Sequence, residues 1–408
     1  MTAQFRYKWQ NLWCLAAAAL LAMTLWFSAS AVIPQLTQEW QLSGGQQSWL
    51  TMSVQLGFVV GALMSAVLNL ADRLPLQRLF AFSAIAGAFC NAAIALWITQ
   101  PGPALGLRFL TGVTLAGVYP VGMKVMTTWC KHDRGLGIGL LVGALTVGSA
   151  SPHLLAVFAS LGATGQLPWR PVLLIASGAA LLAALIMVGF VHTGPFATAA
   201  PPVNWRYAGV AMSDRSIRLA NFGYLGHMWE LYAMWTWVPL VLLACYQQAG
   251  WPESAARFMG FLVIAIGGVS SILAGILADR WGRTTLTLMS LIVSGSCALL
   301  VGFLIASPVA LTILCLVWGF AVIADSAQFS TAVSELSDPR FVGTALTIQT
   351  SMGFLLTLFS IRLIPPLVAI VGWEWAFTVL ALGPMFGIWA MVRLRQLPEA
   401  KKMASGNR

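Results

Sequence analysis

The stretch that decides the fold is Gly275-Ile276-Leu277-Ala278-Asp279-Arg280-Trp281-Gly282-Arg283-Thr284. This charged segment separates two apolar runs, residues 258–277 and 286–305. A helix of roughly 20 apolar residues, rising about 1.5 Å per residue, is long enough to span the hydrocarbon core of a bilayer. The charged segment is therefore predicted to be a tight turn between two membrane-spanning helices.

A similar segment lies in the first half of the chain. Asp72-Arg73 separates two further apolar runs, and Asp279 follows Asp72 by 207 positions. Arg340 follows Arg134 at almost the same offset, 206 positions. A nearly constant offset over half a chain indicates an internal duplication. Paired six-helix halves of this kind are an architecture known for transporters.

The composition excludes an ordinary soluble domain. Hydrophobic residues make up 59% of the 408-residue chain and charged residues only 8%, whereas roughly a quarter of the residues in soluble domains are charged. The net charge of +10 does not indicate nucleic-acid binding, because the basic residues are dispersed among short segments between apolar runs. Most of them fall on one side of the predicted topology, and only Arg170 and Arg257 on the other. This positive-inside bias predicts that both termini and the central loop are cytoplasmic.

The apolar runs predict an all-α membrane protein with 12 transmembrane helices. In the first half they lie at about 12–33, 48–70, 79–99, 104–127, 136–160 and 170–193. In the second half they lie at about 217–244, 254–278, 285–305, 309–331, 341–364 and 374–393. The predicted parts are an N-terminal six-helix bundle (1–193), a cytoplasmic linker (194–214) and a C-terminal six-helix bundle with a basic tail (215–408).

Three local patterns resemble those of the major facilitator superfamily of secondary transporters. Gly275 to Arg283 resembles the family's turn pattern Gly-x-Leu-Ala-Asp-Arg-x-Gly-Arg. Arg108-Phe109-Leu110-Thr111-Gly112 resembles its fourth-helix motif. The fifth-helix pattern is represented by Gly139, Gly143, Gly148 and Pro152. The chain departs from the family in its first-half turn, at Leu68 and Pro75, and in Ser149-Ala150-Ser151, which separates a Gly from a Pro that adjoin in many of the family's exporters.

The resemblance implies two pseudo-symmetric six-helix bundles that work by alternating access to a central site. It also implies that the paired turns form a cytoplasmic gate, comprising Asp72, Arg73, Gly275, Asp279, Arg280, Gly282 and Arg283. The alternative is that these charges only set the topology. The bacterial cyanate- and nitrate-transporter-like branches of the family are candidate relatives.

Ionisable residues within the spans are candidates for the transport pathway, since a charge at bilayer depth costs at least ~2.5–3.5 kcal/mol. Arg108 is either a coupling or substrate-contacting charge, as in the family, or a side chain that reaches the headgroups. His227 and Glu230 share a helix face and form either a proton relay or a pair that fixes helix packing. Asp325 and Gln328 are predicted to contact substrate or a cationic side chain.

Aromatic residues deep in the spans have two interpretations. Trp26, Tyr232 and Trp235 either stack on a substrate in the cavity or pack in the core. A metal site is not expected, because no third ligand lies near His227 and Glu230 in the sequence. No cofactor is expected either, and the sequence has no glycine-rich phosphate-binding motif followed by Lys-Ser/Thr.

The sequence therefore predicts a monomeric secondary transporter of a small solute in the inner (plasma) membrane of a bacterium, without enzymatic activity. Coupling to protons is expected from the ionisable residues within the spans, and a slight preference for an organic or inorganic anion from Arg108 and the aromatic residues. Two alternatives stay open: a proton-antiport exporter of hydrophobic drugs or metabolites, and a transporter-derived membrane sensor.

Overall fold

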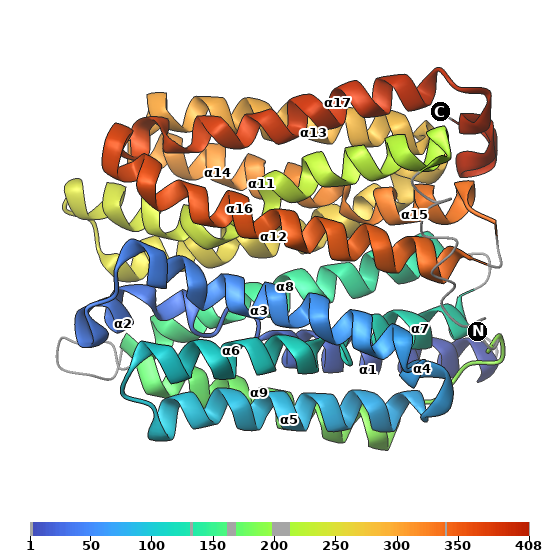
Figure 1. Cartoon of the computed structure of the whole chain (residues 1–408), viewed down its shortest axis with the longest axis horizontal. Helices are drawn as coiled ribbons and strands as arrows, with labels where there is room; N and C mark the ends of the chain where they lie inside the picture. The colour runs from blue at the N-terminus through green and yellow to red at the C-terminus, as the bar shows by residue number, and fades with distance from the viewer. Residues whose placement is uncertain (1–2, 131–133, 161–168, 198–212, 339–340, 408) are drawn as a thin grey trace. The chain divides into compact units, whose positions relative to one another are not determined.

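The chain folds into helices joined by short connections, with no strand in the part that the computed structural model describes (Figure 1). That part comprises residues 3–130, 134–160, 169–197, 213–338 and 341–407. The chain divides into two units, Met1–Ala199 and Ala200–Arg408. Most of the linker predicted at 194–214 lies outside the described residues.

Unit 1 consists of helices that pack mainly through the pairs α3–α6, α5–α9 and α1–α9. Its elements are α1 (Ala3–Met23), η1 (Ser30–Val32), α2 (Ile33–Trp40), α3 (Gly44–Val67), α4 (Leu70–Arg73), α5 (Leu76–Trp97), α6 (Pro101–Leu115), α7 (Tyr119–Trp129), α8 (Arg134–Ser160) and α9 (Trp169–Phe190).

Unit 2 packs mainly through the pairs α11–α17, α12–α14 and α13–α14. Its elements are α11 (Arg215–Gln248), α12 (Glu253–Trp281), α13 (Arg283–Leu304), α14 (Pro308–Ala324), α15 (Ser326–Leu336), α16 (Val342–Ala376), η2 (Phe377–Ala381), α17 (Leu382–Arg395) and η3 (Pro398–Gly406).

The predicted all-α membrane fold is confirmed. In the described residues, 10 helical stretches are long and apolar enough to cross a membrane, and they cover the predicted spans from the second to the last. One stretch, Val342–Arg395, holds the last two of these spans. Gly372 breaks it with a φ of 70°, a conformation that glycine adopts without steric cost. The first predicted span corresponds to α1 and the turn that follows it.

Several spans that were predicted as continuous are interrupted, and the twelfth passes from α16 through the 3-10 helix η2 into α17. The first ends as a helix at Met23, and the chain turns through residues 24–29 before η1 begins. The fourth is divided into α6 and α7, because Pro120 near the start of α7 has no N–H group with which to continue a helix. The tenth is divided into α14 and α15, and Asp325 forms the joint.

Glycines allow close helix packing at the level of these interruptions. A Cβ on Gly57 of α3 would collide with the carbonyl oxygen of Phe109, and one on Gly112 of α6 with that of Val54. Small residues of this kind let two helix backbones approach closely in a membrane protein. These two contacts therefore set the position of α6, which carries the fourth-helix motif, relative to α3.

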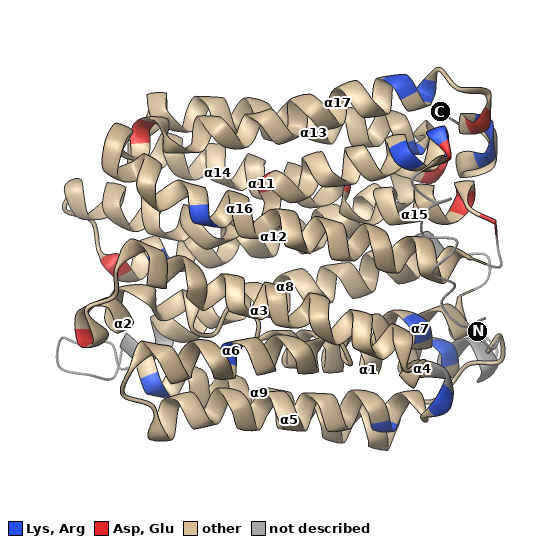
Figure 2. Cartoon of the chain, in the orientation of Figure 1, with Lys and Arg blue, Asp and Glu red and all other residues tan. Residues whose placement is uncertain are grey.

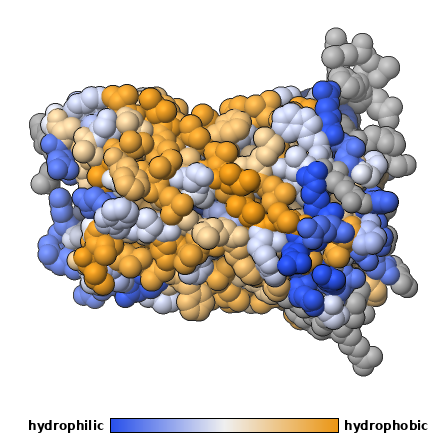
Figure 3. Space-filling view, turned by 90° about the horizontal axis from the view of Figure 1, so that it is seen from above, coloured by the Kyte–Doolittle hydropathy of each residue, from blue (hydrophilic) through white to orange (hydrophobic). Residues whose placement is uncertain are grey.

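The exposed surface suits a bilayer. Large apolar side chains are exposed along the helices, among them Phe82 and Phe89 on α5 and Leu185 and Val188 on α9. On the face drawn in Figure 3, apolar side chains cover the middle and hydrophilic ones cover the two ends. Within each unit most Lys and Arg residues lie toward one helix end (Figure 2), as the charge bias of the sequence predicts.

Candidate functional site

The first polar site lies inside unit 1, where Arg108 of α6 meets the interrupted part of α1. Arg108 is fully buried. One of its terminal nitrogens, Nη1, donates to the carbonyl oxygen of Leu25 at 2.8 Å and to Ser28 Oγ at 3.1 Å. The other, Nη2, donates to the carbonyl oxygen of Trp26. Arg108 Nε donates to the carbonyl oxygen of Leu50 on α3 at 3.2 Å.

These partners explain how a buried guanidinium is tolerated here. Residues that follow the end of a helix have carbonyls without intrahelical partners, and that end carries partial negative charge. Arg108 donates to two carbonyls of the turn that follows α1 and so holds this turn in place. Among the described residues no carboxylate contacts Arg108. Its hydrogen bonds instead join α1 and α3 to α6.

A polar chain extends this site to two further helices. Ser28 Oγ donates to Asn91 Oδ1 of α5 at 2.7 Å. Asn91 Nδ2 in turn donates to the carbonyl oxygen of Leu173 and to Ser177 Oγ, both on α9, at 2.8 and 3.1 Å. The turn at residues 24–29, which follows α1, is thus held from both sides by buried hydrogen bonds.

The second polar site lies inside unit 2, where α11 faces the joint between α14 and α15. His227 Nδ1 lies 2.9 Å from Asp325 Oδ1, and both side chains are 1% exposed. The imidazole also lies beside the rings of Phe329 and Tyr224, with centroids 5.6 and 6.1 Å away. His227 Nε2 has no hydrogen-bond partner among the described residues. The imidazole therefore keeps one nitrogen available for a proton.

Glu230 lies one helical turn further along α11 but has different partners. Its Oε1 accepts from Trp318 Nε1 of α14 at 2.6 Å, and its Oε2 accepts from Ser294 Oγ of α13 at 2.9 Å. The side chain is fully buried. His227 and Glu230 were predicted to share a face, and the structure shows that the carboxylate contacting His227 is Asp325. Unit 2 therefore holds two separate buried carboxyl groups.

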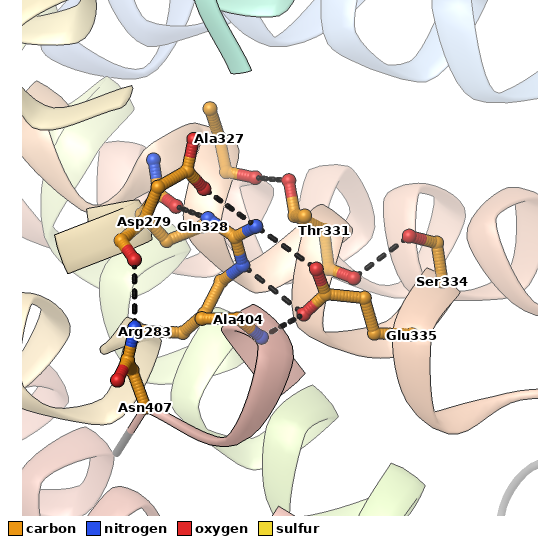
Figure 4. Close-up of polar contacts among 9 residues, drawn as sticks. All are labelled: Asp279, Arg283, Ala327, Gln328, Thr331, Ser334, Glu335, Ala404 and Asn407. Carbon is orange, nitrogen blue, oxygen red and sulfur yellow. Dashed lines mark hydrogen bonds and ion pairs between the residues drawn. The ribbon is translucent and has the colours of Figure 1, made fainter. Parts of the chain in front are cut away.

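A cluster of charged residues, here called the Arg283 cluster, lies where α12, α13 and α15 meet (Figure 4). Arg283 donates to both carboxylate oxygens of Glu335, from Nε at 3.1 Å and from Nη2 at 2.9 Å. Nη2 also lies 3.1 Å from Asp279 Oδ1. Nη1 donates to Gln328 Oε1 at 2.8 Å. Gln328, predicted in the substrate pathway, is thus a member of this cluster.

The C-terminal segment completes the Arg283 cluster. The backbone N–H of Ala404 donates to Glu335 Oε2 at 3.1 Å, and Asn407 Nδ2 donates to the carbonyl oxygen of Asp279 at 2.9 Å. Ala400 and Met403 of η3 are fully buried. Because apolar burial and two hydrogen bonds hold it, the segment forms part of unit 2.

The other predicted gate residues lie in or near the two turns. Gly282 has a φ of 90°, which explains why glycine stands where α12 gives way to α13. Gly275 is buried on α12, whereas Arg280 is exposed. In unit 1, Arg73 is exposed at the end of α4, and the side chain of Asp72 lies outside the described part of the chain.

The predicted aromatic residues are buried within their own units. Trp26 lies against Phe58 with ring centroids 5.0 Å apart. Tyr232 lies between Trp235 and Phe354, at centroid distances of 5.5 and 5.1 Å. In this structure all three predicted residues therefore pack on other aromatic rings. Among the described residues, no group of three or more His, Cys, Asp or Glu side chains is placed to hold a metal ion.

Several site residues were not predicted from the sequence. Glu335, Trp318 and Ser294 each contact a predicted residue that lies more than 40 positions away. Asn91 contacts Ser28, which is itself a hydrogen-bond partner of Arg108. Local spacing carries no signal for such contacts. Asn91 did give a signal, because it is a polar residue in the middle of an apolar run. A polar side chain buried in such a run requires hydrogen-bond partners on other helices.

Comparisons with known proteins agree with this architecture. The chain matches the Major Facilitator Superfamily over residues 15–359 and 220–408. It is 25% identical to the inner membrane metabolite transport protein YgcS of Escherichia coli (strain K12), over 92% of this chain and 88% of that protein.

Solved structures show the same fold. A proton:xylose symporter, XylE, bound to 6-bromo-6-deoxy-D-glucose superposes with a TM-score of 0.73 at 14% identity, covering 96% of each chain. A D-xylose-proton symporter superposes with a TM-score of 0.73 at 15% identity, covering 97% of this chain and 99% of that one.

Proposed function

The chain belongs to the Major Facilitator Superfamily and is a secondary transporter rather than an enzyme, and we propose that it moves a small polar metabolite together with protons. The observation that carries the proton coupling is the pair of buried carboxyl groups in unit 2. Both termini are proposed to be cytoplasmic, from the positive-inside bias of the sequence.

Glu230 is suited to gain and lose a proton. A fully buried carboxylate is stable only when it is paired, hydrogen-bonded or protonated. The side chain of Trp318 and that of Ser294 donate to its ionised form, and Ser294 Oγ can instead accept from a protonated carboxyl. No Lys or Arg in the described residues contacts Glu230. Its charge is therefore balanced by hydrogen bonds, which persist in either state.

His227 and Asp325 form the second proton-carrying group. At 2.9 Å one proton can lie between the imidazole and the carboxylate. A second proton, on Nε2, would convert the pair to imidazolium and carboxylate. Because Asp325 lies at the joint between α14 and α15, this change in charge acts where the tenth span is already interrupted. Protonation is thus proposed to change the angle between these two helices.

The solute is proposed to be a small polar metabolite. The name of the E. coli relative refers to a metabolite, and the two structural neighbours are symporters of protons and xylose. The anion preference expected from Arg108 stays a prediction that the geometry does not support, because its three guanidinium nitrogens all donate to groups of the protein itself. A neutral hydroxylated solute therefore takes precedence as the first test compound.

The Arg283 cluster is proposed to be a latch on the cytoplasmic side of unit 2. It joins the end of α12, the start of α13 and the end of α15 through charge-assisted hydrogen bonds. A bidentate pair between Arg and a carboxylate fixes geometry as well as energy. Opening of the transporter on this side would move α13 away from α15 and break the pair between Arg283 and Glu335.

Uptake by purified protein in liposomes tests the proposal. We expect accumulation of radiolabelled D-xylose when the pH outside is lower than inside, and equilibration only when there is no gradient. Nitrate, tested in parallel, represents the anionic alternative. Equal D-xylose and nitrate uptake with and without a pH gradient would show that protons are not coupled to transport.

A further inference from the structure

Gln55 of α3 is a buried side chain without hydrogen-bond partners. It is fully buried in unit 1, and neither Oε1 nor Nε2 has a partner among the described residues. An amide that loses its hydrogen bonds to water without replacing them destabilises the folded protein. Buried polar groups in native structures are therefore almost always paired. This exception requires an explanation.

The neighbours of Gln55 on α3 show which way it faces. Thr51, one turn earlier, hydrogen-bonds with Ser30 Oγ at 2.7 Å. Phe58, three positions later, packs on Trp26 with centroids 5.0 Å apart. Residues at i, i+4 and i+7 lie on one helix face. Gln55 therefore faces the segment between Trp26 and Ser30, where α1 is interrupted.

The turn that faces Gln55 is fixed by the Arg108 hydrogen bonds. Arg108 binds the carbonyl oxygens of Leu25 and Trp26 on one side and of Leu50 on the other. These bonds fix the interrupted segment relative to α3. On α3, Gly57 lies against the backbone of α6 and fixes that contact too. Two carbonyl oxygens of the facing turn, those of Leu25 and Trp26, are thus already engaged by Arg108.

We propose that Gln55 is a solute-binding residue of unit 1 and that it takes a neutral solute with hydroxyl groups. A carboxamide offers one acceptor and a donor group without charge, and each hydroxyl can both donate and accept. The ring of Trp26 packs on Phe58, which shares the Gln55 face of α3. It offers an apolar surface to the carbon skeleton of such a solute. An interrupted helix opposite a polar side chain is a common setting for transporter binding sites. This inference rests on the proposed function.

Gln55→Leu is the test, with Asn91→Leu as the matched control. Both replace a buried amide of unit 1 by an apolar side chain of similar size. Asn91 has three hydrogen-bond contacts, to Ser28, Leu173 and Ser177, so its replacement is expected to lower the Tm of the purified protein. Gln55→Leu removes an unpaired amide, so we expect its Tm to equal or exceed that of the wild type.

Transport separates a binding role from an unexplained packing feature. In liposomes we expect Gln55→Leu to raise the KM for D-xylose by about tenfold, the effect of losing roughly one hydrogen-bonded contact. An unchanged KM overturns the inference, as does a fall in Tm like that of Asn91→Leu, because either result makes Gln55 a structural residue.

The outcome also distinguishes failure of the proposed function. If the wild type accumulates nitrate and not D-xylose, the neutral-solute inference is overturned while proton-coupled transport stands. If the wild type accumulates D-xylose without needing a pH gradient, the proton coupling fails, and the KM of Gln55→Leu still decides whether this residue binds solute.

Discussion

Glu335→Gln tests the Arg283 cluster, because it removes one charge and leaves the shape of the side chain nearly unchanged. Arg283 would keep Asp279 and Gln328 as partners. It would lose the bidentate pair with Glu335, since a carboxamide offers only one acceptor oxygen. The N–H of Ala404 would also lose an ionised acceptor.

The magnitude follows from the burial of the two partners. The side chain of Arg283 is 7% exposed and that of Glu335 is 25% exposed. Breaking a fully buried pair costs about 3–5 kcal/mol and an exposed pair about 0.2–1 kcal/mol. An intermediate cost of about 2 kcal/mol lowers the Tm of a unit of about 200 residues by about 4–8 °C.

Asp279→Asn is the matched control, because it removes a charge from the same cluster at a more exposed position. The side chain of Asp279 is 56% exposed and lies 3.1 Å from Arg283. Its loss is expected to cost about 0.5 kcal/mol, or about 1–2 °C in Tm. Thermal unfolding in detergent, followed by tryptophan fluorescence, measures both variants. If Asp279→Asn destabilises the protein as much as Glu335→Gln does, the bidentate pair is not what holds this cluster together.

Three further predictions concern other sites. Arg108→Lys is expected to lower the Tm by several degrees, because one ammonium cannot reach the carbonyl oxygens of Leu25, Trp26 and Leu50 together; a wild-type Tm would contradict the role of Arg108 in holding the turn after α1. Deleting residues 398–408 is expected to lower the Tm of the protein, since it exposes the surface that buries Ala400 and Met403, and an unchanged Tm would show that η3 does not stabilise unit 2. Asp214 caps α11: burial raises its pKa, but hydrogen bonds from Ser216 and Ile217 lower it, and the net shift is a decrease. Since the folded pKa is the lower one, its contribution of about 1 kcal/mol is present above the unfolded pKa near 4 and is lost as pH falls through the folded value. The Tm difference between wild type and Asp214→Ala is therefore expected to shrink between pH 6 and pH 3, and a constant difference would contradict this.

The fold was predictable from the sequence because bilayer thickness imposes a minimum length on apolar runs. The runs on either side of Asp279 became α12 and α13, and Gly282 stands at the turn between them. Helix interruptions were less predictable. Pro120 gave a local signal for the break after α6, whereas nothing in the residues around Asp325 indicates that α14 ends there.

The sequence identified several site residues but not their contact partners. His227, Glu230 and Asp325 were identified because ionisable groups are rare in apolar runs. The spacing of His227 and Glu230 suggested a pair, yet His227 contacts Asp325 at the joint between α14 and α15, whereas Glu230 contacts α13 and α14. Side-chain direction depends on which helices lie beside α11, and that packing is a property of the folded unit. Arg283 shows the same limit, because Glu335 lies 52 positions away.

The most direct test of the central claim is gradient-driven D-xylose accumulation by the Glu230→Gln, Asp325→Asn double variant. A carboxamide imitates a protonated carboxyl that cannot release its proton. We expect the variant to exchange labelled for unlabelled D-xylose across the liposome membrane but to accumulate none when a pH gradient is applied. Accumulation at the wild-type level would contradict the account, because protons would then be coupled to transport without either buried carboxyl group.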